Sequence, residues 1–245
     1  INLNMFDSMI QFYAPNITET PILPESDSQH CVRVLRMKEG DTIEVIDGKG
    51  YRYTCRLIDA HPKRAHIEII DKTLIPLSWD NQIIVAVAPT KHLDRMEWMV
   101  EKLTEIGVNQ IIPLLCRHSE RKEIKVERLE KIAISAMKQS LKSTLPIISP
   151  MTSFKEVIQD ISTAQKFIAY CDTSIPRKLL SNEYISHKDT IILIGPEGDF
   201  SIEEIQLALN NNYQPISLGD NRLRTETAAV VACDTCHIIN QINTI

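Results

Sequence analysis

Apolar runs and helically spaced apolar residues alternate along residues 83–171. Continuous apolar runs at 83–88, 111–115 and 167–171 predict buried strands. Between them, apolar side chains recur every three or four residues, which predicts helices over 93–106 and 126–141. Gly107 follows the first helix, where a C-terminal cap is expected. Strands that alternate with helices predict an α/β domain with a doubly wound, mostly parallel sheet.

The next predicted strand leads into a glycine turn and a new helix. Residues 191–194 form an apolar run that suits a strand buried on both faces. Gly195 and Gly198 then break the extended pattern. Ser201 and Glu204 have the spacing of a capping box, so a helix is predicted to begin directly after Ser201. In α/β proteins, ligand sites form where a strand ends in such a turn.

The turn after this strand carries acidic side chains and no basic ones. Glu197, Asp199, Glu203 and Glu204 crowd it, and no Lys or Arg occurs in residues 189–221. Helix N-termini usually attract phosphate, which these carboxylates would repel. The turn therefore predicts a neutral or cationic ligand held by backbone groups. An ordinary capped turn without a ligand remains an alternative interpretation.

A second strand end repeats this arrangement. Residues 215–218 predict a short strand, and Gly219 turns the chain. Residues 222–229 add arginine, threonine and glutamate side chains before an apolar helix. Two consecutive strand ends with glycine turns favour a ligand site over a simple capped turn.

The first part of the chain has a different pattern. A short helix is predicted over 28–37, and strands over 42–46, 51–58 and 64–70. Short, closely spaced strands predict a small barrel. Residues 74–79, which contain a proline, form the predicted boundary between two domains. Basic and acidic residues nearly balance in this part, so its charge alone does not distinguish an RNA-binding barrel from a structural one.

Composition excludes several classes of protein. The chain has 245 residues, 43% of them hydrophobic, and a net charge of −5. No apolar run approaches the roughly 20 residues of a membrane helix, and the N-terminus has no secretory-signal pattern. Six Cys without disulfide-scaffold spacing favour reduced thiols in a cytoplasm, and the seven His show no metal-ligand spacing.

One basic segment occurs on this acidic chain. Residues 117–142 contain eight Lys or Arg and four acidic residues. Such a patch can bind phosphates locally. A solvated helix with ion pairs at i,i+4, such as Glu127 with Lys131, accounts for the same charges. The charge pattern leaves both interpretations open.

Three further features are predicted to be structural. Cys233, Cys236 and His237 match the C-x-x-C-H haem-attachment pattern, but they lie in an apolar run that predicts the buried final helix. Packed core thiols are therefore expected, with redox use of the pair as the alternative. Trp79 and Trp98 are predicted to anchor packing rather than to stack on bases.

The two glycine turns together carry a family resemblance. The first contains Gly195-Pro196-Glu197-Gly198, then Ser201 and Glu204; the second contains Leu218-Gly219, then Leu223-Arg224-Thr225-Glu226-Thr227-Ala228. In this order and spacing they resemble the ribosomal RNA small subunit methyltransferase E family, which belongs to the SPOUT class of knotted methyltransferases. Lys91 and residues 102–108, 119–121 and 139–140 also match. The resemblance covers nearly the whole chain from Met9, which is the expected natural start.

The resemblance implies a fold and a reaction. The expected reaction transfers a methyl group from S-adenosylmethionine to N3 of a uridine in 16S rRNA, free or in the small ribosomal subunit. The expected fold has a PUA-like RNA-binding β-barrel over 9–74 and a SPOUT domain over 80–245 that ends in a trefoil knot. A homodimer is expected, without a metal or a membrane. The cationic sulfonium agrees with the acidic turn, and a uracil N3 proton must be lost before attack.

The resemblance also implies roles for residues on the two turns and on the basic segment. The expected cofactor-binding residues are Leu193, Gly195, Glu197, Gly198, Leu218, Gly219, Leu223, Thr225, Thr227 and Ala228. The expected catalytic residues are Arg224, which would stabilise the uracil anion, Glu226, either as a base or as an acid favoured by the helix dipole, and Arg121. The expected RNA contacts are Arg33, Arg36, Lys91, Arg121, Lys138, Gln139 and Lys142.

Three positions depart from the family pattern. The family usually has Gly where Asp199 stands and Arg where Asn221 stands, and Lys142 occupies a place often held by Arg. Asn221 leaves open which arginine orients the substrate, since Arg222 could substitute, and Lys142 lacks bidentate phosphate geometry. Two alternative functions stay open: a methyltransferase of another RNA such as tRNA, and a non-catalytic RNA-binding or ribosome-assembly protein that kept the fold.

Overall fold

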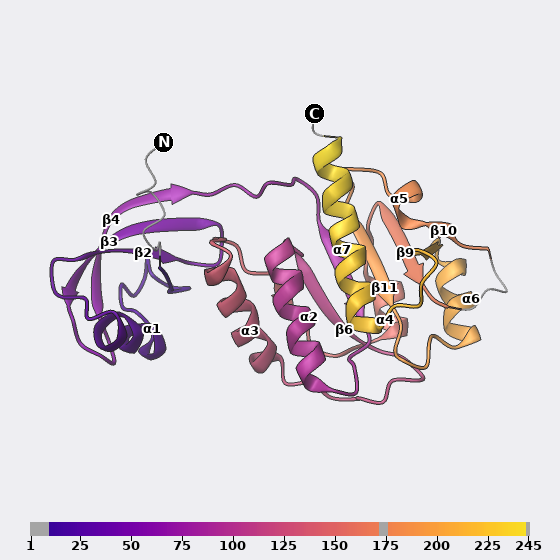
Figure 1. Cartoon of the computed structure of the whole chain (residues 1–245), viewed down its shortest axis with the longest axis horizontal. Coiled ribbons are helices and arrows are strands. Elements are labelled where there is room, and N and C mark those ends of the chain that lie inside the picture. The colour runs from indigo at the N-terminus through magenta and orange to yellow at the C-terminus, as the bar shows by residue number, and fades with distance from the viewer. Residues whose placement is uncertain (1–9, 172–175, 244–245) are drawn as a thin grey trace. The chain divides into compact units, whose positions relative to one another are not determined.

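A computed structural model describes residues 10–171 and 176–243 (Figure 1). Met9, the expected start, lies outside the described residues. The chain forms two compact units: the described residues up to Ser78 together with Ile134–Leu145, and Trp79–Ala133 together with the described residues from Pro146 onward. The domain ranges 9–74 and 80–245 stay predictions. None of the helices in the described ranges combines the length and the apolar character that crossing a membrane requires.

The N-terminal unit contains a four-stranded sheet. Its order is β1 (Gln11–Tyr13), β2 (Thr42–Ile46), β3 (Tyr51–Asp59) and β4 (His66–Leu74), with β1 parallel to β2 and the remaining pairs antiparallel. The three strands predicted from the sequence are therefore confirmed, with shifted ends. The predicted helix instead begins as α1 (Glu25–Gln29) and continues as the π-helical turn η1 (His30–Val34).

The helical segment packs on this sheet around one apolar core. Phe12, Tyr53 and Leu57 from the strands and Leu23 and Cys31 from the helical side are all buried in the same cluster. Alternating burial along β3 shows the period of two that a sheet with one covered face requires. The hydrophobic pattern of the strands therefore accounts for the layer arrangement of this unit.

The second unit is built on a parallel sheet. Its order is β10-β12-β9-β11-β5-β6-β7, and β8 also pairs with β6. The strands are β5 (Ile83–Val87), β6 (Gln110–Leu115), β7 (Ile147–Ile148), β8 (Thr152–Ser153), β9 (Gln165–Ala169), β10 (Lys178–Leu179), β11 (Thr190–Ile194) and β12 (Gln214–Ser217). The helices are α2 (Leu93–Ile106), α4 (Phe154–Asp160), α5 (Leu180–Glu183), α6 (Ile202–Asn210) and α7 (Thr225–Ile242). Helix α3 (Val126–Gln139) is divided between the units, because its residues from Ile134 onward belong to the first. The predicted α/β fold with a mostly parallel sheet is confirmed.

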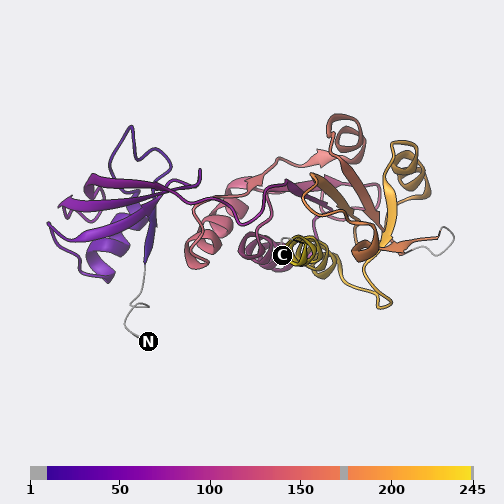
Figure 2. The ribbon, with the colours of Figure 1, turned by 90° about the horizontal axis from the view of Figure 1, so that it is seen from above.

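Helices cover both faces of this sheet. Figure 2 shows α4 and α6 on one side and α2 and α7 on the other. Phe154, Ile158 and Ile205 of α4 and α6 share a buried cluster with Ile84 and Ile191 of the central strands. Every residue of β5 and β11 is buried, as expected for strands covered on both faces. The apolar runs in the sequence identified these central strands because burial on both faces leaves no alternating pattern.

Gly107 ends α2 and lies against an aromatic ring. Its φ of +123° suits glycine, and an added Cβ would lie 2.4 Å from the ring of Trp79. The Trp79 indole N–H donates to Asn109 Oδ1 at 3.1 Å, and the ring packs edge-on against His237. The predicted cap and the packing role of Trp79 are confirmed. Trp98 is 44% exposed, so the packing role predicted for it stays a prediction.

The C-x-x-C-H sequence lies inside α7. Cys233, Cys236 and His237 are buried, and burial raises the pKa of Cys236 to about 12. A thiol with so high a pKa stays protonated near neutral pH and reacts slowly. The predicted role as packed core thiols is confirmed.

Candidate cofactor site

Three neighbouring strands end at one edge of the parallel sheet. The order β12-β9-β11-β5 brings the carboxyl ends of β9, β11 and β12 together, although they are far apart in the sequence. The loops after these strands surround a cavity of about 340 Å³. Such a volume lies in the range of small-molecule sites, which occupy this edge in open α/β sheets.

The turn between β11 and α6 forms one wall and requires close approach of the backbone. An added Cβ at Gly195 would lie 3.1 Å from the ring of Phe200, and one at Gly198 would lie 3.2 Å from Cβ of His118. Ser201 caps α6 through the predicted capping box with Glu204. The glycines therefore allow the turn to fold tightly between the strand and the helix.

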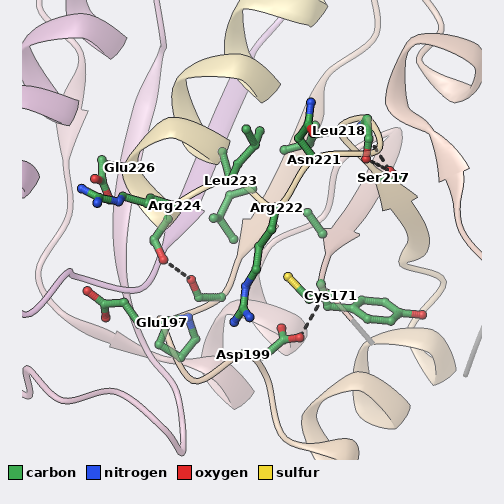
Figure 3. A pocket seen from close by; sticks show the side chains of 18 of the residues that line it. Cys171, Glu197, Asp199, Ser217, Leu218, Asn221, Arg222, Leu223, Arg224 and Glu226 are labelled. Carbon is green, nitrogen blue, oxygen red and sulfur yellow. Dashed lines mark hydrogen bonds between the residues drawn. The ribbon is translucent and has the colours of Figure 1, made fainter. Parts of the chain in front are cut away.

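The loop between β12 and α7 forms the opposite wall. Gly219 has a φ of +119° with no atom within 4 Å of an added Cβ, so its glycine serves the backbone conformation. The Ser217 hydroxyl donates to the carbonyl of Gly219 at 2.9 Å and fixes this bend. Figure 3 shows Leu218 and Leu223 among the side chains that line the cavity. This wall combines an exposed backbone with apolar side chains.

One hydroxyl joins the two walls. Thr225, the first residue of α7, donates its hydroxyl to the carbonyl of Gly195 at 3.1 Å, and the contact is buried. The dashed line between the two loops in Figure 3 marks this hydrogen bond. Thr225 therefore fixes the distance between the two glycine turns.

The charges around the cavity are mixed. Glu226 is buried, and its Oε1 lies 3.8 Å from Nε of Arg95. Glu197 accepts the backbone N–H of Lys91 at 3.2 Å. The cavity lining includes the acidic side chains of Glu197, Asp199 and Glu226 and the basic side chains of Arg95, Arg177, Arg222 and Arg224. The acidic turn carries none of these basic groups: Arg222 and Arg224 come from the second glycine turn, whereas Arg95 and Arg177 come from other segments.

A shallower depression adjoins this cavity. Arg95, Arg222, Leu223, Arg224 and Glu226 line both, and Asp94, Trp98 and Thr227 line only the depression. The half-exposed Trp98 ring therefore lies close to the arginine side chains of the site.

Within the described ranges, no group of three or more His, Cys, Asp and Glu side chains is arranged to hold a metal ion.

Comparison with known proteins identifies the family. The model of an RNA methyltransferase domain matches residues 78–237, and the model of an RNA methyltransferase PUA domain matches residues 23–70. The ribosomal RNA small subunit methyltransferase E of Buchnera aphidicola subsp. Acyrthosiphon pisum is 32% identical and aligns with 86% of this chain and 84% of its own length. The chain belongs to the ribosomal RNA small subunit methyltransferase E family.

Solved structures agree with this assignment. A probable rRNA-methyltransferase from Porphyromonas gingivalis is 43% identical, with a TM-score of 0.91 over 95% of this chain and 99% of that one. A ribosomal RNA small subunit methyltransferase E from Neisseria gonorrhoeae, bound to S-adenosylmethionine, is 28% identical, with a TM-score of 0.83 over 95% and 98%. The fold of this chain is therefore similar to that of both proteins.

Most residues expected to bind the cofactor of this family line the cavity. They are Gly195, Glu197, Leu218, Gly219, Leu223, Thr225 and Ala228, together with the expected catalytic residues Arg224 and Glu226. Leu193 is buried within β11, Gly198 packs on His118, and Thr227 lines the adjoining depression. The roles of all these residues stay predictions.

Several cavity residues were not singled out from the sequence. Arg95 comes from the first turn of α2, and Tyr170 and Cys171 follow β9. Arg177 donates to the carbonyl of Tyr170. The order of the parallel strands was the missing information, because β9 lies between β11 and β12 but precedes both in the sequence.

The residues expected to contact RNA differ in their present partners. Arg121 donates to the carbonyls of Thr90 and Lys91 and does not line the cavity. Lys138 pairs with Asp27 at 2.6 Å, and Lys91 Nζ pairs with Glu120 at 3.0 Å. The exposed residues of this set are Arg33, Arg36, Lys91 and Gln139, while Lys142 is half-buried. Their RNA contacts stay predictions.

Proposed function

We propose that this protein is an S-adenosylmethionine-dependent methyltransferase that modifies N3 of a uridine in 16S rRNA. The observation that carries the proposal is the cavity at the carboxyl ends of β9, β11 and β12 in a member of the methyltransferase E family. Two structural relatives that are 26% and 28% identical contain bound S-adenosylmethionine. The uridine and its N3 position are the finer part of the proposal and come from the family resemblance.

The lining of the cavity fits S-adenosylmethionine. This cofactor carries an apolar-faced adenine, a carboxylate and two cationic groups, and the cavity offers leucine side chains, arginines and carboxylates. Leu218, Gly219 and Leu223 would hold the adenosine part, because their loop exposes backbone groups beside apolar side chains. Glu197 and Glu226 would face the cationic groups. When bound, the cofactor supplies a methyl group that is already activated for transfer.

The protein's task is then to prepare the uracil. N3 must lose its proton, and the negative charge that results needs a nearby cation or hydrogen-bond donor. Arg224 is exposed at the start of α7, where the cavity and the adjoining depression meet, so its guanidinium can reach the negative charge on the uracil. Glu226 is the candidate proton acceptor, held by Arg95. The target base must be unpaired to enter, since its N3 edge is normally paired.

The proposed assembly is a homodimer formed through α2 and α7. These helices pack against each other and lie on one face of the sheet. Each carries large apolar side chains that are exposed in the single chain: Trp98 at 44%, Ile238 at 48% and Ile242 at 65%. We infer that these side chains belong to one apolar patch, which would mark an interaction surface. A dimeric mass in solution that Trp98→Asp converts to monomer would support this surface; a monomeric wild-type protein at micromolar concentration would contradict it.

Two further features belong to the proposal. A trefoil knot is proposed for the C-terminal segment, in line with the SPOUT class. Support comes from α7, which follows β12, the second strand from one edge, yet returns to pack on β5 and β11 near the middle of the sheet. A ribosomal RNA substrate would also assign the activity to the cytoplasm.

Calorimetric titration with S-adenosylmethionine and S-adenosylhomocysteine tests the cofactor. Binding at one site per subunit supports the methyltransferase, whereas absence of binding to both ligands, with and without RNA, favours a non-catalytic RNA-binding protein. Mass spectrometry of RNA from a deletion strain tests the substrate. Loss of one methylated uridine from 16S rRNA, restored by the gene, supports the proposal. Loss from tRNA instead would contradict it.

A further inference from the structure

Asp199 occupies a backbone conformation that glycine usually adopts. Its φ is +63°, in the left-handed region, and it lies in the turn between β11 and α6. Aspartate is among the few residues that tolerate this region at modest cost.

The carboxylate of Asp199 joins two segments of the cavity wall. Its Oδ2 accepts the backbone N–H of Cys171 at 2.8 Å, and its Oδ1 accepts the backbone N–H of Phe200 at 2.9 Å. Cys171 follows β9, whereas Phe200 precedes α6. Figure 3 shows Asp199 beneath the cavity with its hydrogen bond to Cys171. Glycine at this position cannot form either bond.

The backbone of Asp199 is held from a third side. Its carbonyl oxygen lies 3.0 Å from Nδ1 of His118, which follows β6 and packs against Gly198. Asp199 therefore connects the ends of three strands, β6, β9 and β11, at the edge where the ligand site lies. Cys171 and Asp199 both line the cavity, so the geometry of these connections is also the geometry of its wall.

We propose that Asp199 is a positioning residue for S-adenosylmethionine: its carboxylate fixes Cys171, just after β9, against the β11–α6 turn and so pre-organises the cofactor cavity. This inference rests on the proposed function. A wall that is ordered before binding reduces the loss of conformational freedom on binding. Hydrogen bonds to a carboxylate are stronger than neutral ones, which makes this connection effective.

Two other roles make different predictions. A carboxylate near the N-terminus of α6 stabilises the helix by its charge, and its loss would lower the melting temperature without changing cofactor affinity. A carboxylate that attracts the cofactor by charge would favour S-adenosylmethionine, which carries a sulfonium, over S-adenosylhomocysteine, which does not. A positioning role affects both ligands by the same factor.

The test compares Asp199→Gly and Asp199→Asn with the wild-type protein by calorimetric titration of both ligands without RNA. Glycine keeps the backbone conformation and removes both hydrogen bonds, so both affinities should fall about tenfold. Asparagine tolerates the conformation and keeps one acceptor oxygen, so it should restore part of the loss. Exchange of the Cys171 amide hydrogen should be faster in Asp199→Gly than in the wild type.

The outcomes separate this inference from the proposed function. Equal losses for the two ligands, with partial rescue by asparagine, support positioning. Wild-type affinity in Asp199→Gly overturns it, and so does a loss confined to S-adenosylmethionine. If the wild-type protein binds neither ligand, both the proposed function and this inference are contradicted. If the wild-type protein binds both ligands and the Asp199 variants bind them equally well, this inference alone is overturned.

Discussion

Replacing Arg121 distinguishes a positioning role from an RNA-phosphate contact. Its Nη2 donates to the carbonyl of Lys91 at 2.8 Å, and its Nε donates to the carbonyl of Thr90 at 3.3 Å. The Lys91 backbone N–H in turn donates to Glu197 at 3.2 Å, on the cavity wall. The guanidinium therefore supports the β5–α2 loop, and the loop supports Glu197. Arg121→Ala removes the first link of this series.

The structure gives an approximate size for the effect. A hydrogen bond from a charged donor contributes about 1.5–3 kcal/mol. The 3.3 Å bond is near the limit of useful geometry and counts for little, so the bond to Lys91 accounts for most of the effect. We expect Arg121→Ala to lower the free energy of unfolding by about 2 kcal/mol. Part of this loss should appear as an affinity for S-adenosylmethionine reduced about fivefold to tenfold without RNA.

The assay is calorimetric titration of the cofactor beside urea denaturation. Arg117→Ala is the matched control. The Arg117 guanidinium pairs with Glu203 at 3.1 Å, and both side chains are more than 60% exposed. Its replacement should therefore lower the free energy of unfolding by less than about 0.5 kcal/mol. Arg121→Lys should recover little, because an ammonium cannot form the two-pronged contact. Unchanged stability and cofactor affinity in Arg121→Ala, with weaker and less salt-dependent RNA binding, would refute the positioning role.

Three further perturbations test packing, exposure and thiol burial. Gly107→Ala should lower the free energy of unfolding in urea by about 2 kcal/mol more than Gly219→Ala does. Both glycines have φ near +120°, but only an added Cβ at Gly107 would meet the Trp79 ring, so equal losses would contradict the clash. A thiol reagent should modify Cys171 alone in the native protein, because the other five cysteines are buried, and bound cofactor should slow it; several fast thiols would be inconsistent with this burial. Between pH 9 and 11, the thiol of Cys236 ionises in the unfolded chain but stays protonated in the folded protein, where its pKa is about 12. The free energy of unfolding should therefore fall by up to about 1.4 kcal/mol per pH unit as the pH rises. Chemical denaturation of Cys236→Ala over this range should show a shallower decline, and an unchanged slope would contradict the assignment.

The elements predicted correctly from the sequence are those with a local signal. The apolar run of β11 and the capping box at Ser201 lie within a few residues of each other, so no tertiary information was needed. The strands β7, β8 and β10 are two residues long and have no period to detect. Helix α4 was missed although Ser153 and Glu156 form a capping box of their own, which the sequence could have revealed.

The candidate site was predicted only in part, because only some of its residues belong to local sequence motifs. Both glycine turns contribute residues to the cavity, Arg222 and Arg224 among them, but part of its positive charge comes from other segments. Arg95 lies on α2 and Arg177 follows β9, so their proximity to Glu226 and Glu197 depends on strand order. The motifs alone could therefore not assign these two arginines to the site.

The basic segment 117–142 shows that tertiary contacts decide whether a basic side chain is available to bind phosphate. Its excess of Lys and Arg suggested either free phosphate-binding groups or ion pairs along one helix. In the structure, Lys138 pairs with Asp27, which lies 111 positions away, and Arg128 pairs with Glu97 of α2. Arg121 is directed to backbone carbonyls. These cations already stabilise the fold, and their use by a phosphate would cost the protein contacts they now make. RNA binding by this segment should therefore depend more on its exposed lysines, such as Lys122, than its net charge suggests.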